Sequence, residues 1–373
     1  MKKKAVVAGH ICIDITPVFP GKIVSKAEVI LQPGKLIHMD GVDIHTGGCV
    51  ANTGLAMKIL GNDVVLMGKV GDDSFGKVIL EILKKYDADG EMIVSDDSAT
   101  SYSVVLAIPG IDRIFLHDPG ANDTFTKEDL DYDRIREASL FHFGYPPIMR
   151  NMYEDEGVQM AEMFERIKEG GTVVSLDMAA IDPNSEAGKA DWGKILSRVL
   201  PFVDFFVPSV EELCFMLDKE RFAEWEQRSG GGDMTEILMP EDIASLAQKV
   251  LAMGAKSVLI KCGAPGMYYK TSAAESMKEL CSKLGLTLEE WADREGFEKS
   301  YKPDAVVCGT GAGDTSIAAF LTSVLNGESL AISLQMATAT GACCVEAFDA
   351  LSGLKPLDEL KTKISAGWQK NGE

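Results

Sequence analysis

Residues 154–177, EDEGVQMAEMFERIKEGGTVVSLD, decide the fold class of this chain. Apolar side chains recur at helical spacing from Glu154 to Lys168, and Gly170-Gly171 is typical of the end of a helix. The apolar run from Thr172 to Leu176 then predicts a short buried strand, with Asp177 directly after it. A helix that leads straight into a buried strand is the repeating unit of an α/β fold.

The same alternation recurs on both sides of this stretch. Ala5 to Ile13 predicts one continuous buried strand, and Val50 to Leu60 predicts a helix that Gly61 ends. Further short strands are expected over residues 64–67, 202–207 and 257–261. Alternating units of this kind form a mainly parallel central sheet with helices on both faces.

Two stretches depart from the alternation. Residues 18–45 and 101–117 are rich in strand-forming residues, are interrupted by Gly and Pro, and lack helical spacing, so each predicts a hairpin. Together they predict a small β lid, which leaves residues 1–17, 46–100 and 118–373 as the α/β core. Residues 222–240 predict a flexible insertion, and residues 273–297 predict an inserted helical segment.

Composition excludes several classes of protein. The 373 residues include 57 acidic and 37 basic side chains, and a net charge of -20 is the wrong sign for nucleic-acid or anionic-membrane binding. No apolar run approaches the roughly 18 residues that a membrane span needs. The eight cysteines contain no C-x-x-C pair, and Asp14 interrupts the apolar N-terminal run, so a cytoplasmic location is expected.

Two glycine-rich stretches near the N-terminus are weak signals by themselves. Residues 71–78 match the spacing of a phosphate-binding P-loop as far as Lys77, but Val78 replaces the hydroxyl that would bind Mg²⁺. A turn into a helix over 74–85 is therefore favoured. The second stretch runs from Gly47 to Asn52, where two glycines would allow a ligand close to the backbone and Asn52 offers a donor and an acceptor.

The third glycine-rich stretch, Cys308-Gly309-Thr310-Gly311-Ala312-Gly313-Asp314, precedes a long helical segment. Asp314 stands where a dinucleotide-binding fingerprint would have its third glycine, so dinucleotide binding is disfavoured. Small residues at a helix N-terminus allow an anion close to unpaired N–H groups. A carboxylate beside such a site suits phosphoryl transfer, although Asp314 is equally suited to capping its helix.

These stretches resemble a known family. Residues 47–61 and 68–76 are similar to the N-terminal signature of the ribokinase-like (PfkB) carbohydrate kinases, and residues 309–314 resemble the C-terminal signature. Asp14, the stretch 118–122 and the stretch 261–266 add weaker similarity, so the resemblance spans nearly the whole chain.

The resemblance implies ATP and Mg²⁺ as cofactors and a sugar-like substrate under the β lid. It implies Asp314 as the general base and an anion hole formed by Gly311, Ala312 and Gly313. For the remaining sites, the implied substrate-binding residues are Asp14, Gly47, Gly48, Asn52 and Arg113, and the implied nucleotide-binding residues are Lys261, Gly263, Gly266, Thr310 and Gly313. Glu212 would bind the metal through water.

Two departures from the family pattern leave alternatives open. Ser209 stands where the family usually has Asn, and Cys308 where many members have an Asp associated with a monovalent cation. A non-catalytic sugar or nucleotide sensor is therefore one alternative. A nucleoside kinase of the same fold is another, with Phe19, Phe115 and Tyr145 available to line a base pocket. A homodimer through the β lid is also expected.

Overall fold

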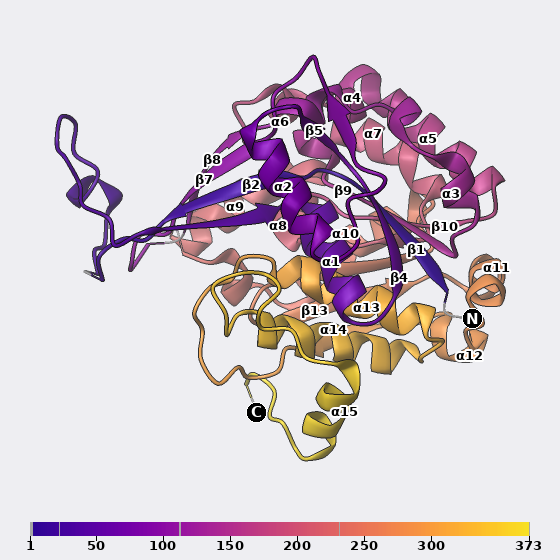
Figure 1. Cartoon of the computed structure of the whole chain (residues 1–373). Coiled ribbons are helices and arrows are strands. Elements are labelled where there is room, and N and C mark those ends of the chain that lie inside the picture. The colour runs from indigo at the N-terminus through magenta and orange to yellow at the C-terminus, as the bar shows by residue number, and fades with distance from the viewer. Residues whose placement is uncertain (1–2, 22, 112, 231, 373) are drawn as a thin grey trace.

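The computed structural model describes residues 3–21, 23–111, 113–230 and 232–372 (Figure 1). Within these residues a central eight-stranded sheet has the order β14-β13-β12-β11-β10-β9-β1-β4. The strands from β4 to β12 in that order are parallel, and β13 and β14 are antiparallel at one edge. Their bounds are β1 (Lys4–Gly9), β4 (Asp63–Met67), β9 (Leu140–Gly144), β10 (Val173–Leu176), β11 (Phe205–Phe206), β12 (Ser257–Lys261), β13 (Gly266–Thr271) and β14 (Glu295–Lys299).

Helices cover both faces of this sheet, as the sequence predicts. One face packs against α3 (Tyr132–Arg136), α5 (Val158–Glu169), α7 (Trp192–Val199), α8 (Val210–Leu217) and α10 (Pro240–Ala252). The other packs against α1 (Cys49–Ile59), α2 (Ser74–Lys84), α11 (Ala274–Leu284), α12 (Leu288–Trp291), α13 (Ala312–Leu325) and α14 (Leu330–Cys344). The remaining helices are α4 (Arg150–Tyr153), α6 (Glu186–Lys189), α9 (Lys219–Ser229) and α15 (Leu357–Ser365).

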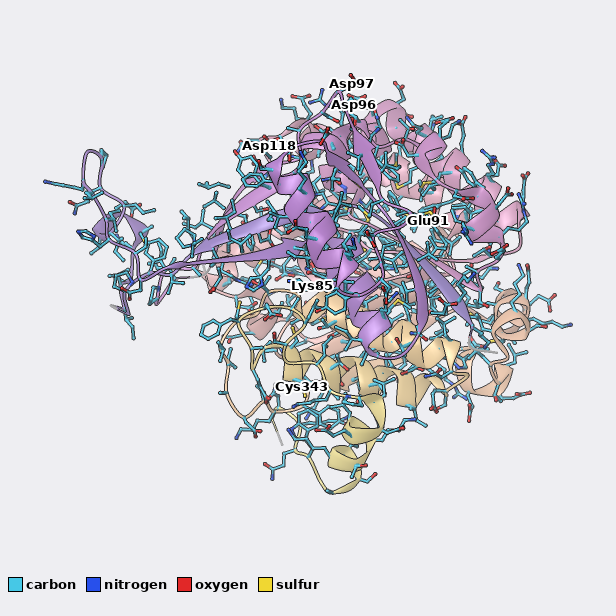
Figure 2. The ribbon with its side chains drawn as sticks, in the orientation of Figure 1. Lys85, Glu91, Asp96, Asp97, Asp118 and Cys343 are labelled. Carbon is cyan, nitrogen blue, oxygen red and sulfur yellow. The ribbon has the colours of Figure 1, made fainter. Side chains whose placement is uncertain are left out.

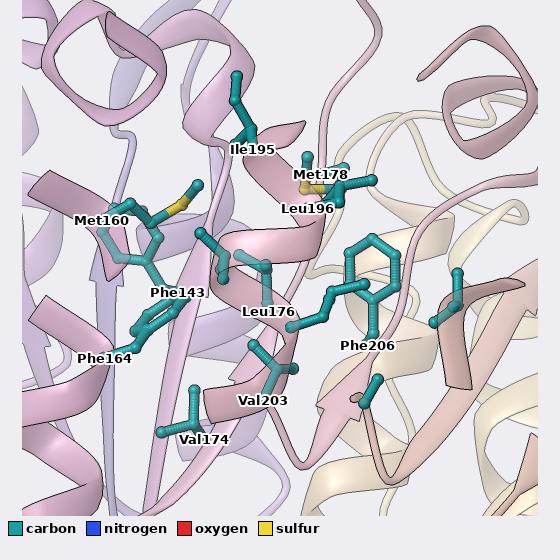
Figure 3. Close-up of a cluster of buried hydrophobic side chains, with 14 of the residues drawn as sticks. Phe143, Met160, Phe164, Val174, Leu176, Met178, Ile195, Leu196, Val203 and Phe206 are labelled. Carbon is teal, nitrogen blue, oxygen red and sulfur yellow. The ribbon is translucent and has the colours of Figure 1, made fainter. Parts of the chain in front are cut away.

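The core divides into two layers because successive side chains of a strand point to opposite faces. In β1, Val6 and Ala8 belong to one buried cluster, whereas Ala5 and Val7 belong to the other. Figure 3 shows part of the first cluster, where Leu176 of β10 lies among side chains of neighbouring strands and helices. Burial on both faces explains why these strands are continuous apolar runs.

A second, four-stranded sheet has the order β3-β2-β7-β8. It consists of β2 (Cys12–Pro17), β3 (Val42–Gly47), β7 (Tyr102–Leu106) and β8 (Ile114–Asp118), and we call it the lid sheet. The segment between β2 and β3 extends away from the body of the molecule at the left of Figure 1. A short parallel pair, β5 (Lys69–Gly71) and β6 (Ile93–Ser95), lies outside both sheets.

The structure differs from the sequence prediction at the first strand. The expected strand 5–13 is two strands, because Gly9 has φ 120° and a Cβ atom there would lie 1.9 Å from the carbonyl oxygen of Gly144. The chain turns away at this point, and β2, which the sequence placed with the core, pairs within the lid sheet. The turn is fixed by the Asn122 side chain, which bonds both the N–H and the C=O of Ile11.

Three further segments also differ from their prediction. The helix expected over 154–168 begins as α5 at Val158, after a turn in which Asp155 and Glu156 have positive φ. The insertion expected to be flexible over 222–240 contains most of α9, which continues to Ser229. The segment 273–297 contains α11 and α12 as expected, but its end forms the start of edge strand β14.

The surface carries much of the acidic excess. Asp96, Asp97 and Asp118 are exposed at the outer edge of the molecule in Figure 2. Of the helices formed by the described residues, none combines the length and the apolar character that crossing a membrane requires.

Candidate functional site

Polar side chains gather at the carboxyl edge of the central sheet. His10 follows β1, Tyr145 follows β9, Asp177 follows β10, and Lys261 is the last residue of β12. These strands are parallel, so their carboxyl ends meet at one edge, which is where open α/β sheets bind ligands. Of these four residues, Lys261 had a predicted site role, Tyr145 was expected only as aromatic lining, and His10 and Asp177 were not predicted.

The carboxylate of Asp314 lies at this edge, in the first turn of α13, and is buried. Its Oδ2 accepts a hydrogen bond from Asn52 Nδ2 at 3.0 Å. Its Oδ1 accepts hydrogen bonds from Thr53 Oγ1, at 3.4 Å, and from the hydroxyl of Tyr145. Helix α1, which supplies Asn52 and Thr53, packs against α13. Two adjacent helices and the turn after β9 therefore fix the carboxylate.

This arrangement bears on the choice between a helix cap and a reactive group. The N-cap position of α13 is Gly311, and the helix has no side-chain cap hydrogen bond. The side chain of Asp314 bonds to α1 and Tyr145 instead of the N–H groups of its own helix. Asp314 is therefore not the N-cap residue of α13.

Small residues allow close packing around the start of α13. Gly311 has φ 75°, and a Cβ atom there would lie 2.3 Å from Cβ of Ala350. A Cβ atom at Gly313 would lie 3.3 Å from Cδ of Lys261. The predicted anion-hole residues thus stand at the N-terminus of a 14-residue helix with the Lys261 side chain beside them. Such an N-terminus favours negative charge.

Asp14, Gly47 and Gly48 lie on the lid side of the carboxyl edge. Asp14 of β2 pairs in register with His45 of β3, and burial raises the pKa of the Asp14 carboxyl. A Cβ atom at Gly47 would lie 2.3 Å from Oδ2 of Asp14, and one at Gly48 would lie 2.5 Å from Nδ1 of His10. The glycine pair therefore makes room for two polar side chains, whereas the sequence predicted only that it allows a ligand close to the backbone.

Lys261 forms a buried ion pair with Asp177. Its Nζ lies 2.6 Å and 2.9 Å from the two carboxylate oxygens, and Asp177 has no solvent exposure. Burial favours the neutral amine, but the carboxylates of Asp177 and Glu212 hold the pKa of Lys261 above its ordinary value. The lysine is therefore a fixed positive charge beside Gly313.

A large open cavity of about 1380 Å³ lies next to this charge. Its walls include the turn 263–266 after β12, the start of α13, and part of α14. Both insertions noted in the sequence contribute, through Asp233 and Glu236 from one and Phe297 from the end of the other. Among the residues that the sequence assigned to nucleotide binding, those lining the cavity are Lys261, Gly263, Gly266 and Gly313.

Glu212, the predicted metal residue, takes part in a capping box. Ser209 is the N-cap of α8, where Glu212 N–H donates to Ser209 Oγ at 3.2 Å and Ser209 N–H donates to Glu212 Oε2 at 2.7 Å. The neighbouring Glu211 lines the large cavity. In the described part of the chain, no group of three or more His, Cys, Asp or Glu side chains is arranged to hold a metal ion.

Arg113 connects the lid sheet to the loop before α13. It precedes β8, and its Nη1 donates to Oγ1 of Thr310. The thiol of Cys308 donates to the same hydroxyl at 3.2 Å. Arg113 also lines the large cavity, as Lys261 does. The structure thus brings Arg113 to the predicted phosphate loop.

The three aromatic residues considered for a base pocket lie in different surroundings. Phe19 is buried in a small cluster with Val24 and Ile108 beside the lid sheet. Phe115 of β8 is exposed, and Tyr145 bonds Asp314. They do not form a common pocket.

The N-terminal signature stretch 68–76 has a structural role at its end. Asp73 is the N-cap of α2, accepting from Gly76 N–H at 2.9 Å, and its other oxygen accepts from Thr100 N–H at 2.7 Å. The favoured turn into a helix is confirmed, since α2 begins at Ser74.

Comparison with known proteins agrees with this fold. The family model described as "pfkB family carbohydrate kinase" matches residues 2–356. A probable fructokinase-7 of Arabidopsis thaliana is 23% identical over 371 residues, covering 96% of this chain and 91% of that protein.

Two solved structures resemble the whole chain. Ribokinase of Arabidopsis thaliana, complexed with ribose and ATP, aligns with TM-score 0.70 at 20% identity, covering 97% and 98% of the two chains. A putative ribokinase II of E. coli, in complex with ATP and Mg²⁺, aligns with TM-score 0.67 at 22% identity, covering 98% and 99%. The chain therefore has the ribokinase fold and belongs to the pfkB family of carbohydrate kinases.

Proposed function

We propose that this carbohydrate kinase transfers the γ-phosphoryl group of ATP to a hydroxyl of a sugar or sugar-like acceptor, with Asp314 as the general base. The observation that carries this proposal is the fixed, buried carboxylate of Asp314 in the first turn of α13, with Lys261 beside the same turn. A general base must be held within hydrogen-bond reach of the hydroxyl that it deprotonates, next to the phosphoryl group.

The hydrogen bonds of Asp314 indicate which of its oxygens acts. An ionised carboxylate has about four lone-pair sites, two on each oxygen. Oδ1 accepts from both Thr53 and Tyr145, whereas Oδ2 accepts only from Asn52 among the described residues. The second lone pair of Oδ2 is thus the position for the acceptor hydroxyl.

The transfer then proceeds in one displacement. The acceptor oxygen forms a bond to the γ-phosphorus while its proton moves to Oδ2 of Asp314, and the bond from that phosphorus to the bridging oxygen of ADP breaks. The N–H groups of Gly311 to Gly313 and the charge of Lys261 face the phosphates, where negative charge changes during transfer. Arg113, which bonds Thr310 in the loop before α13, adds positive charge beside them, and the lid sheet would exclude water.

The residues present fit a magnesium–ATP substrate. The cavity beside Lys261 is large enough for a nucleotide, and Mg²⁺ is commonly held by one or two carboxylates, phosphates and water. Glu212, whose Oε2 accepts the capping bond from Ser209, would hold it through water. When bound, the metal would neutralise phosphate charge.

Asp314→Asn tests the proposal. It preserves shape but removes the base, so kcat should fall by roughly 10²- to 10⁴-fold, while ATP affinity by calorimetry changes little. Asp358→Asn, at an exposed position in α15, is the control and should match wild type. Turnover of Asp314→Asn within a few-fold of wild type would contradict the assignment.

We also propose that two copies of the chain associate through the lid sheet. Its strands carry exposed apolar side chains, namely Val42 and Ile44 of β3 and Phe115 and Leu116 of β8. Phe115 and Leu116 are adjacent in a strand, so they expose apolar surface on opposite faces of the sheet. Sedimentation should show that the wild-type chain is a dimer and that the Ile44→Glu variant is a monomer. A monomeric wild-type chain would contradict the proposed association.

A further inference from the structure

Two histidines beside the base have ring nitrogens that the protein does not use. His10 is 2% exposed, and neither Nδ1 nor Nε2 has a hydrogen-bond partner among the described residues. The Nε2 atom of His117 is likewise buried without a partner in that part of the chain. A buried polar atom without a partner is costly and calls for an explanation, such as a ligand that completes it.

Both rings lie within the group of residues around Asp14 and Asp314. The centroid of the His10 ring is 5.1 Å from that of His117 and 6.0 Å from that of Tyr145, whose hydroxyl bonds Asp314. Nδ1 of His10 faces the Gly48 turn at the start of α1. The two histidines therefore lie where the proposed acceptor would meet the lid sheet.

The backbone around His10 is held in place. Its N–H donates to the carbonyl of Gly144 at 2.7 Å, and its C=O accepts from Val50 N–H at 3.1 Å. The next residue, Ile11, is bonded on both sides by Asn122. His117 is oriented by a 3.0 Å hydrogen bond between its Nδ1 and Ser103 Oγ. Both rings are thus preorganised, which is typical of ligand-binding groups.

The charges around these rings favour an uncharged ligand. Burial, together with the neighbouring His117, lowers the pKa of His10 well below its ordinary value, so this imidazole is neutral and offers one donor and one acceptor. Burial also lowers the pKa of His117. The carboxylates of Asp14 and Asp314 lie nearby, whereas the positively charged side chains of Arg113 and Lys261 line the large cavity that we assign to the nucleotide. An anionic acceptor would therefore face like charge.

We propose that His10 and His117 bind hydroxyl groups of the acceptor, and that the acceptor is an uncharged sugar or polyol and not a sugar phosphate or a sugar acid. This inference rests on the proposed phosphotransfer at Asp314. It adds two specificity-determining residues to the site and a chemical class to the substrate. Neutral imidazoles match hydroxyl groups, which also both donate and accept.

A panel of acceptors tests the chemical class. ADP release by the wild-type enzyme is measured with free pentoses and hexoses, cyclic polyols, nucleosides, sugar 6-phosphates and sugar acids. The best uncharged sugar or polyol should exceed every anionic acceptor by roughly 100-fold or more in kcat/KM. A preferred sugar phosphate, sugar acid or nucleoside would overturn the inference while phosphotransfer stands. If no acceptor is phosphorylated, the proposed function itself fails.

Substitutions of His117 test the residues separately from the panel. The amide of Asn overlays Nδ1 of histidine, and the amide of Gln overlays Nε2. His117→Asn should therefore keep the Ser103 contact but raise the acceptor KM roughly 10-fold, whereas His117→Gln should stay closer to wild type. KM for ATP should be unchanged in both. Equal effects of Asn and Gln on acceptor KM would mean that Nε2 contacts no substrate.

His10→Phe gives a second readout, because it keeps a ring but removes both nitrogens. Acceptor binding measured by calorimetry without nucleotide should weaken roughly 10-fold or more. His38→Gln, exposed in the segment between β2 and β3, is the control and should bind like wild type. If His10→Phe folds and binds acceptor as tightly as wild type, the proposal is wrong; if it does not fold, the paired His117 variants decide.

Discussion

The hydroxyl of Tyr145 donates a hydrogen bond to Oδ1 of Asp314. The donor directly follows β9, and the acceptor lies in the first turn of α13. Together with Thr53, this contact occupies Oδ1, whereas among the described residues Oδ2 accepts one hydrogen bond, from Asn52. The geometry of the proposed base thus depends on a residue far from it in sequence.

Removing that hydroxyl should slow catalysis without changing nucleotide binding. Tyr145→Phe frees one side of the carboxylate, so we expect kcat to fall about 10-fold, equivalent to about 1.4 kcal/mol of transition-state stabilisation. KM for ATP should stay within twofold of wild type. Tyr153→Phe, which removes a hydroxyl from a tyrosine packed against Trp192, is the matched control. An unchanged kcat for Tyr145→Phe would show that Asn52 and Thr53 suffice to orient the base.

Asp14 and Asn52 should respond differently to truncation. Asp14→Ala removes the proposed acceptor contact together with the 3.3 Å hydrogen bond from the Cys12 thiol, so acceptor binding should weaken by about 1–3 kcal/mol while ATP binding is intact. Asn52 also donates to Asp314, so Asn52→Ala should weaken acceptor binding and lower kcat as well. Calorimetry and steady-state rates measure the two effects. Weakened ATP binding with unchanged acceptor binding would reverse the assignment of the two sites.

The acid stability of the fold should depend on Asp73. Burial raises the pKa of this carboxyl, but N–H groups of Thr100 and Gly76 outweigh it and hold the pKa below its ordinary value. A depressed folded-state pKa contributes stability that is present above the unfolded value, about 3.9, and is lost as pH falls through the folded value. Asp73→Ala should therefore lower the free energy of unfolding at pH 6, with a smaller difference from wild type near pH 3. Urea unfolding of wild type and variant at pH 6 and at pH 3 measures the difference in free energy of unfolding. An equal difference at the two pH values would contradict the prediction.

Cys308 should leave the enzyme with little dependence on K⁺. Its thiol donates to Thr310, and a thiol is a poor ligand for a hard cation. We expect similar kcat/KM in potassium, in sodium and in a bulky organic cation at matched ionic strength. A tenfold preference for K⁺, about 1.4 kcal/mol, would refute this expectation. Cys308→Asp is the converse variant and should create K⁺ dependence without changing the preferred acceptor.

Much of the fold could be predicted from local patterns. The run of apolar residues in 257–261 is β12 at its predicted bounds, and the helix over 50–60 is α1 within one residue. The strand at 5–13 could not be predicted correctly, because its break at Gly9 comes from the carbonyl of Gly144, a neighbour across the sheet. The end of the insertion 273–297 was misjudged for a similar reason, since edge strand β14 exists only by pairing with β13.

The sequence by itself determined the fold class and the family, because hydrophobic spacing and glycine positions act over a few residues and survive without tertiary contacts. It also singled out Asp314, through the glycine loop before its helix. Only the tertiary structure decided what surrounds that carboxylate. Tyr145, Asp177 and His10 each follow a different parallel strand, and they come together because a parallel sheet aligns the carboxyl ends of strands that are distant in sequence.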